Sequence, residues 1–202
     1  MVPLPFSRPA TAIPERDGRC LARLARGVIA EALGGPVCQE LGAFGFDGPG
    51  ACFVTLTLDG NLRGCIGSLS PSESLVEGVI DHARAAAFQD PRFTPVQREE
   101  LPRLAVEVSM LSPLSPLACS GEEDLLRQLR PGVDGLVLDQ EGHRAVFLPQ
   151  VWKELQDPRT FLAALKRKAG WSAGFWSPRI RAWTFTVEAW HDEPPPVRPH
   201  GS

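Results

Sequence analysis

The feature that most constrains the fold is a pair of adjoining segments joined by turn residues. Residues 52–58 alternate between apolar and small polar side chains, and residues 59–61, Asp-Gly-Asn, are typical of tight turns. The segment 61–68, NLRGCIGS, follows at once. This pattern predicts a β-hairpin that must enter a sheet.

The length of the hairpin loop decides which side chains share a face. A three-residue loop gives the apolar pairs Leu58–Leu62, Leu56–Gly64 and Val54–Ile66 and the polar pairs Thr57–Arg63 and Thr55–Cys65. A two-residue loop would instead place Arg63 and Cys65 on the face of the leucines. We favour the three-residue loop, because a slip by one residue would bury a guanidinium among leucines.

Alternation along the second strand puts Arg63 and Cys65 on the same side. A nearby positive charge favours the thiolate, the form that attacks electrophiles. Gly64 and Gly67 mark places where a ligand or a second backbone approaches closely. The alternative is that Cys65 is a small core residue, since free cysteines are usually buried and no nucleophile–base–orienter set is apparent.

Length, net charge and cysteine content limit the kinds of protein that this chain can be. The 202 residues allow one large domain or two small packed ones. A net charge of −3 gives no support for nucleic-acid or anionic-membrane binding. The five cysteines are odd in number and contain no C-x-x-C pair, which fits neither a disulfide framework nor a zinc site. We expect no metal or cofactor. Without an apolar leader or membrane-length segment, a cytoplasmic location is expected.

Two helices and a strand are expected around the hairpin. The first helix follows Asp17 and stops at 34–36, Gly-Gly-Pro, and a glycine-rich loop covers 36–50. Residues 70–73, Ser-Pro-Ser-Glu, read as a capping box that starts a second helix close to Cys65 and ends before 90–91, Asp-Pro. Its N-terminal amides either hold an anionic group or are already satisfied by the capping box.

The strand 103–111 carries Glu107 and Ser109 on the side away from its apolar residues. If this strand joins the hairpin sheet, Glu107 becomes a partner for Arg63 or a general base near Cys65. The alternative is an ordinary exposed glutamate.

The rest of the chain mixes strands and helices without regular alternation. Expected elements are a helix over 120–129, a hairpin over 135–148, a short helix over 149–155, a helix from Asp157 to Gly170 with solvated basic residues at 166–168, and a strand over 179–190. Residues 1–16 read as an extended lead-in and 191–202 as a mobile, proline-rich tail. This order favours an α+β fold with a mostly antiparallel sheet and helices packed on it.

Several segments together resemble the AMMECR family, called AmmeMemoRadiSam system protein A where it accompanies MEMO-type and radical-SAM proteins. The matching stretches are FVTL at 53–56, LRGCIG at 62–67, DPRF at 90–93, VEVS at 106–109, LSP at 111–113, GLV at 135–137, LPQV at 148–151 and 166–170. They run in order over about residues 20–190.

The resemblance implies one domain over 17–190, with larger and smaller subdomains and a cleft lined by the hexapeptide. It also implies partnership with a MEMO-like protein and a radical-SAM enzyme, but it supplies no settled reaction. By motif position, the candidate catalytic residues are Cys65, Arg63 and Glu107. The candidate ligand-binding residues are Thr55, Gly64, Gly67, Asp90, Arg92 and Ser109.

Three hypotheses of function follow. In the first, Cys65 is a nucleophile or covalent carrier, Arg63 activates it and orients a small anionic substrate, and Glu107 acts as acid or base. In the second, the same cleft binds a small ligand or nucleotide without reacting. In the third, the surface is a scaffold for the partner proteins.

Overall fold

The structure is a computed structural model that describes residues 13–36 and 48–192. Most of the expected lead-in, glycine-rich loop and tail lies outside these ranges. Contacts divide the described residues into a large unit, residues 13–111 and 188–192, and a small unit, residues 112–187. Among the described residues, no helix is long and apolar enough to cross a lipid bilayer.

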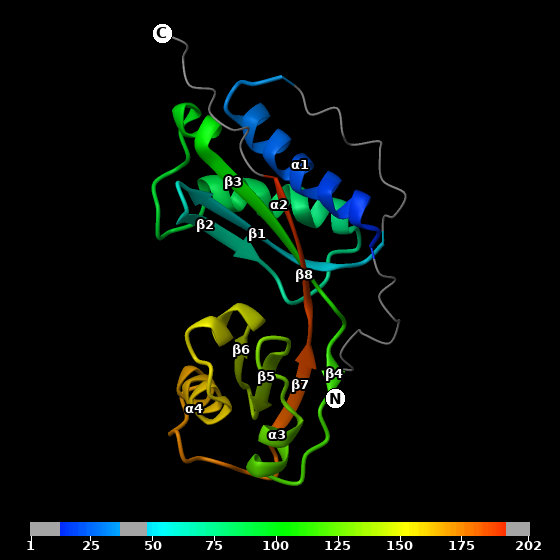
Figure 1. Ribbon diagram of the computed structural model, residues 1–202, viewed down its shortest axis with the longest axis vertical. Helices are drawn as coiled ribbons and strands as arrows, with labels where there is room; N and C mark the ends of the chain where they lie inside the picture. The colour runs from blue at the N-terminus through cyan, green and yellow to red at the C-terminus, as the bar shows by residue number, and fades with distance from the viewer. Residues whose placement is uncertain (1–12, 37–47, 193–202) are drawn as a thin grey trace. The chain divides into compact units, whose positions relative to one another are not determined.

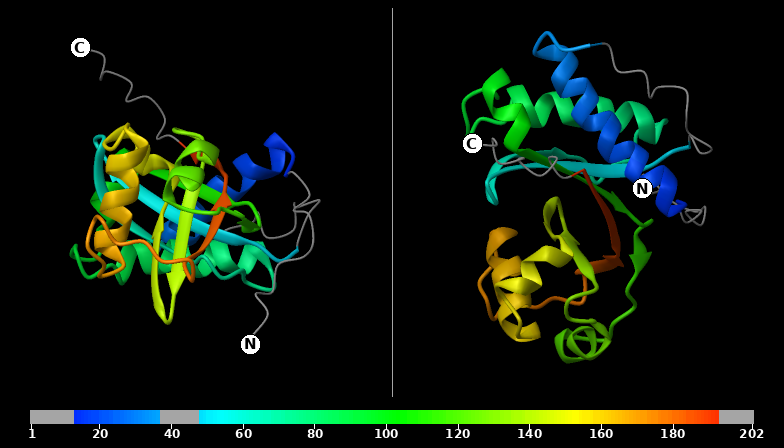
Figure 2. Two further views of the ribbon diagram at one scale, coloured as in Figure 1. Left: turned by 90° about the horizontal axis from the view of Figure 1, so that it is seen from below. Right: turned by 45° about the horizontal axis from the view of Figure 1, so that its top comes forward.

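The large unit is a four-stranded sheet with two helices on one face (Figures 1 and 2). Its strands are β1 (Ala51–Leu58), β2 (Asn61–Gly67), β3 (Leu104–Leu111) and β8 (Val187–Asp192), in the order β2-β1-β3-β8. Its helices are α1 (Glu15–Ala32), α2 (Leu75–Phe88) and the 3-10 helix η2 (Arg98–Arg103). The domain expected over residues 17–190 therefore starts two residues after the first residue of α1. It ends two residues before the last residue of β8.

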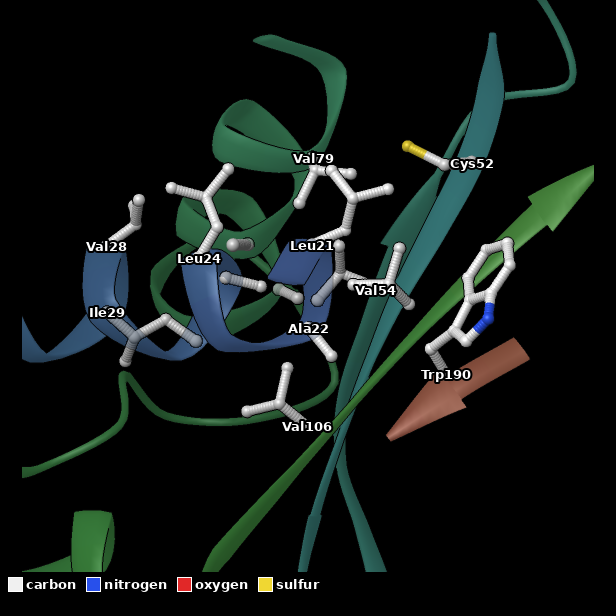
Figure 3. Close-up of a cluster of buried hydrophobic side chains, with 14 of the residues drawn as sticks. Leu21, Ala22, Leu24, Val28, Ile29, Cys52, Val54, Val79, Val106 and Trp190 are labelled. Carbon is white, nitrogen blue, oxygen red and sulfur yellow. The ribbon is translucent and has the colours of Figure 1, made fainter. Parts of the chain in front are cut away.

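The core of the large unit lies between the sheet and the helices α1 and α2 (Figure 3). One apolar stripe of α1 meets every second residue of the strands, as the helical and strand periods require. The residues labelled in Figure 3 are Leu21, Ala22, Leu24, Val28, Ile29, Cys52, Val54, Val79, Val106 and Trp190. The odd-numbered residues of β1 and β3 therefore face away from the helices.

The hairpin between β1 and β2 has a two-residue loop, so the predicted three-residue loop is wrong. Asp59 and Gly60 have φ of 51° and 80°, both in the left-handed region, as in a type I′ turn. The register nevertheless shifts beside Leu56, which leaves Arg63 unpaired in a β-bulge. A bulge absorbs one residue, because it sets two residues of one strand against one of the other.

The bulge preserves three of the five predicted pairs. The pairs Val54–Ile66, Thr55–Cys65 and Leu56–Gly64 are confirmed. The pairs predicted nearer the turn are wrong, because Leu58 pairs with Asn61 and Thr57 with Leu62.

Helix α2 starts later than its sequence predicted. Its N-cap is Ser74, whose hydroxyl accepts a hydrogen bond from the Glu77 amide at 3.1 Å. The expected cap at Ser70 is wrong, because Ser72 is drawn into a β-bridge with Gly50. The helix start is therefore four residues farther along the chain from Cys65 than expected. The predicted end before Asp90 is confirmed.

The small unit is a second four-stranded sheet, in the order β4-β7-β5-β6. Its strands are β4 (Ser115–Pro116), β5 (Gly135–Gln140), β6 (His143–Phe147) and β7 (Arg181–Phe185). Its helices are α3 (Glu122–Gln128), the 3-10 helix η3 (Pro149–Lys153) and α4 (Pro158–Lys168). The predicted second hairpin and the Asp157 cap of α4 are confirmed.

Two expectations in the small unit are wrong. Lys166 is not a solvated last-turn residue: it is fully buried, with its ammonium 2.8 Å from a Glu122 carboxylate oxygen and 3.0 Å from the Ala173 carbonyl oxygen. The long strand over 179–190 is divided at Thr186, whose carbonyl accepts from the Ser112 amide. Its two halves enter different sheets.

The α+β class is thus confirmed, with antiparallel pairing wherever a register is described. The cleft between the subdomains stays a prediction.

Candidate functional site

A row of four polar side chains crosses the face of the large-unit sheet that is opposite α1 and α2. We call it the open face because neither of these two helices packs on it. Cys65 pairs with Thr55, and Thr55 pairs with Glu107. His191 lies on the far side of Glu107, with its Nδ1 3.6 Å from Glu107 Oε2. We call these four residues the polar row. It contains one residue from each strand of the sheet.

The thiol of Cys65 is half-buried and has a hydrogen-bond donor next to it. The Thr55 hydroxyl donates to the Cys65 sulfur at 3.3 Å. This contact follows from the confirmed part of the hairpin register, because directly opposite residues on one face lie within side-chain reach. The sulfur therefore has a fixed neighbour on β1.

The main chain of Cys65 is held by the loop that follows α2. Strand β2 is at the edge of its sheet, and the Cys65 amide donates to Asp90 Oδ2 at 2.9 Å while its carbonyl accepts from Arg92 Nη2 at 3.2 Å. Asp90 and Arg92 thus take the place of a neighbouring strand at this residue.

The two side chains that hold the main chain of Cys65 also form an ion pair with each other. Arg92 Nη2 lies 2.7 Å from Asp90 Oδ2, and the Asp90 side chain is 2% exposed. The Arg92 guanidinium is the main reason that the pKa of the Asp90 carboxyl lies well below its usual range. Hydrogen bonds from the Cys65 and Arg92 amides lower this pKa further, whereas burial raises it. The pKa of Arg92 is raised, mainly by Asp90 and to a smaller extent by Cys65. Arg92 is therefore a cation adjacent to Cys65.

Arg63, which sequence alone placed beside the thiol, is occupied elsewhere. Its Nε and Nη2 donate to the two carboxylate oxygens of Glu100 at 2.7 and 3.0 Å, and Nη1 donates to the Thr94 carbonyl at 2.8 Å. The Arg63 guanidinium lowers the pKa of Glu100, although burial opposes the shift. Arg63 thus anchors the segment from Thr94 to Glu100 on β2.

The two glycines of the hexapeptide make room for protein atoms. A Cβ on Gly64 would lie 2.2 Å from the Ala86 carbonyl oxygen of α2, so this glycine lets a second backbone approach, on the face away from Cys65. A Cβ on Gly67 would lie 2.3 Å from the Phe53 ring. Both positions are explained by packing.

Glu107 is engaged away from Cys65. Its Oε1 accepts a hydrogen bond from the Ser109 hydroxyl at 2.8 Å, and its Oε2 faces His191. Ser109 is 2% exposed, and it lies on the same face of β3 two residues farther along. The carboxylate is therefore held by a hydrogen bond at Oε1, while Oε2 lies 3.6 Å from His191 Nδ1.

The structure thus brings Cys65, Thr55, Glu107 and Ser109 onto one face, with Asp90 and Arg92 at its edge. Gly64 faces α2 instead, and the Arg63 guanidinium binds Glu100, Thr94 and Pro95 rather than Cys65. Sequence reasoning missed His191, which lies one residue beyond the expected strand. Strict alternation through the expected strand puts His191 on the same side as Trp183, Phe185 and Val187, so the sequence pattern provides no signal for it.

A second thiol lies on the core side of the same sheet. The Cys52 sulfur is 3.4 Å from His82 Nδ1, and burial raises the pKa of the Cys52 thiol to about 12. Burial also lowers the pKa of His82, although Asp81 opposes the shift. Both the burial and the raised pKa of Cys52 disfavour its thiolate form. In the described ranges, no three His, Cys, Asp or Glu side chains form a group able to hold a metal ion.

Comparison with known proteins identifies relatives over most of the chain. The family model described as AMMECR1 matches residues 22–190. A protein of Methanothermobacter thermautotrophicus is 38% identical over 182 residues, which cover 88% of this chain and 95% of that protein. A protein of Thermococcus gammatolerans is 43% identical over 141 residues, 68% of each chain. The crystal structure of the uncharacterized protein PH0010 from Pyrococcus horikoshii is 35% identical, covers 90% of this chain and 95% of its own, and superposes with a TM-score of 0.77. The chain belongs to the AMMECR1 family.

Proposed function

We propose that this protein binds a small anionic substrate on the open face and reacts with it through the thiol of Cys65. The observation that carries the proposal is that both parts of Cys65 are positioned: Asp90 and Arg92 hold its main chain, and Thr55 donates to its sulfur. A core cysteine requires neither contact. Preorganised neighbours of this kind are typical of groups that must meet a ligand in one geometry.

In the reaction, the sulfur of Cys65 forms a bond to an electrophilic carbon of the substrate. The bond from that carbon to its leaving group breaks, the leaving group takes the electron pair, and it receives the thiol proton through water. Arg92, whose side chain is 53% exposed, provides the positive charge that attracts the anionic group. Arg63 contributes by anchoring the neighbouring segment.

Alkylation of the folded protein tests the proposal. Iodoacetamide is added at pH 7 and the labelled cysteines are located by mass spectrometry. Cys65 is expected to label faster than the half-buried Cys20, while Cys52 stays unlabelled until denaturation. Thr55→Val keeps the side-chain shape and removes the donor, so it should slow Cys65 labelling about 3- to 10-fold, about the effect of one neutral hydrogen bond. A Cys65 that resists labelling in the folded state would overturn the proposal.

One observation favours a second function, ligand binding without a covalent step. Glu107 is turned toward Ser109 and His191, so in the described part of the chain no hydrogen bond joins the Cys65 sulfur to a carboxylate or a histidine that could act as a general base. For a binding protein, inorganic phosphate should raise the melting temperature equally in the wild type and in Cys65→Ser. Arg92→Gln should remove that stabilisation, while Arg84→Gln, an exposed change on α2, should keep it.

We also propose that the protein acts in the cytoplasm as the partner of a MEMO-like protein and a radical-SAM enzyme, and the family resemblance supports the partnership. The hexapeptide LRGCIG and the ordered motifs around it support this partnership. Affinity purification of the tagged chain from its native cells tests it. Recovery of both partner classes is the expected result, and their absence from a purification that retains the folded bait contradicts it.

A further inference from the structure

We propose that His191, oriented by Glu107, is a proton-transfer group of the open face and acts on the end of an elongated ligand opposite the end that meets Cys65. The inference rests on the proposed function of this face, and it names a second reacting group and the shape of the substrate.

The positioning of His191 begins with a buried hydroxyl. Ser109 is 2% exposed and donates to Glu107 Oε1 at 2.8 Å, which fixes the plane of the carboxylate. The other oxygen, Oε2, lies 3.6 Å from His191 Nδ1. This distance is longer than a hydrogen bond, but contacts of catalytic pairs are commonly loose before the ligand binds. The three residues form a chain in which Ser109 orients Glu107 and Glu107 orients His191.

The chemistry of this chain favours one tautomer of the histidine. A carboxylate facing Nδ1 accepts a proton there, so the lone pair is left on Nε2. The His191 side chain is 54% exposed, whereas that of Glu107 is 28% exposed, so the imidazole is the accessible member of the pair. When Nε2 takes a proton from a ligand, the positive charge on the ring is compensated by Glu107, and the same proton is available for return.

The sheet sets the distance between the two reacting groups. Cys65 and His191 lie on the first and last strands of the order β2-β1-β3-β8, three strand spacings apart. At about 4.8 Å per spacing, this is roughly 14 Å between main chains. His191 therefore does not deprotonate Cys65 directly.

Thr55 and Glu107 lie between the two ends of the row. The ligand that uses both ends is elongated. It carries an electrophilic carbon with an anionic group at the Cys65 and Arg92 end, and a proton-bearing oxygen or nitrogen at the His191 end.

The tautomer of His191 can be measured without knowing the ligand. Two-bond 1H–15N correlation spectra of protein labelled with 15N-histidine are recorded at pH 8, with His191 assigned by loss of its signals in His191→Gln. The expected wild-type pattern is a protonated Nδ1 and an unprotonated Nε2. Glu107→Met removes the acceptor at similar length and should move most of the population to the Nε2–H form.

Glu188→Met is the matched control, because it makes the same change at an exposed position of β8 three residues before His191. It should leave the tautomer unchanged. A wild-type His191 in the Nε2–H form overturns the proposal by itself, even where a variant does not fold. An unchanged tautomer in a folded Glu107→Met also overturns it. Iodoacetamide labelling of Cys65 in the same samples separates the two claims, because an unreactive Cys65 with an oriented His191 refutes only the nucleophile.

Discussion

The ion pair between Arg63 and Glu100 separates two explanations of the hexapeptide. If Arg63 anchors the segment from Thr94 to Glu100, its removal lowers stability and leaves the thiol largely unaffected. If it activates the thiol, as sequence alone suggested, its removal slows the reaction of Cys65 and leaves stability largely unaffected. Arg63→Ala therefore distinguishes the anchoring role of Arg63 from the activating role.

The size of the stability loss follows from the contacts that the substitution removes. Arg63 donates four hydrogen bonds, two to the Glu100 carboxylate and one each to the Thr94 and Pro95 carbonyls. Removing one partner of a fully buried pair costs about 3–5 kcal/mol. The Arg63 and Glu100 side chains are 13% and 20% exposed, so water replaces part of the interaction. We therefore expect Arg63→Ala to lower the free energy of unfolding by about 2–3 kcal/mol.

Urea unfolding followed by circular dichroism measures this loss. The double-mutant cycle with Glu100→Ala should give a coupling energy of about 1–2 kcal/mol, because the two residues share two charge-assisted hydrogen bonds. Arg84→Ala, an exposed change on α2, should cost less than about 0.5 kcal/mol. A loss below about 0.5 kcal/mol for Arg63→Ala, together with a tenfold slower labelling of Cys65, would refute the anchoring role.

Two further predictions concern the packing and protonation of the large unit. Gly64→Ala puts a methyl group against the Ala86 carbonyl oxygen and should lower the free energy of unfolding by about 1–3 kcal/mol, whereas Gly174→Ala, with open space around it, should change it by less than about 0.5 kcal/mol in the same urea assay. Because burial lowers the pKa of His82, the unfolded chain binds its proton first as the pH falls below about 6.5, so stability should fall between pH 7 and 5. His82→Gln should show a shallower fall, and an identical slope would contradict the argument.

Much of the local structure could be predicted because it depends on neighbouring residues. The apolar stripe of α1, the core-facing residues Leu104, Val106, Val108 and Met110 of β3, and the Asp157 cap of α4 are confirmed. The hexapeptide also pointed to the family that the comparisons establish. Each of these signals is contained within a few helical turns or one strand.

The partners of the charged residues could not be predicted in the same way. Arg63 meets Glu100, which is 37 residues away, and Arg63 itself lies in a bulge that the turn residues did not predict. His191 meets Glu107 across 84 residues of chain, because β8 joins β3 in the large unit.

The sequence by itself determined the α+β class, the positions of the hairpins and the core-facing residues of β1 and β3, since these depend on side-chain period and turn chemistry. The tertiary structure alone decided that the cation adjacent to Cys65 is Arg92, that Lys166 is buried, and that a histidine completes the polar row. The physical reason is that a charged group finds its partner by proximity in space. Spacing along the chain does not encode that proximity when the partners belong to different strands and loops.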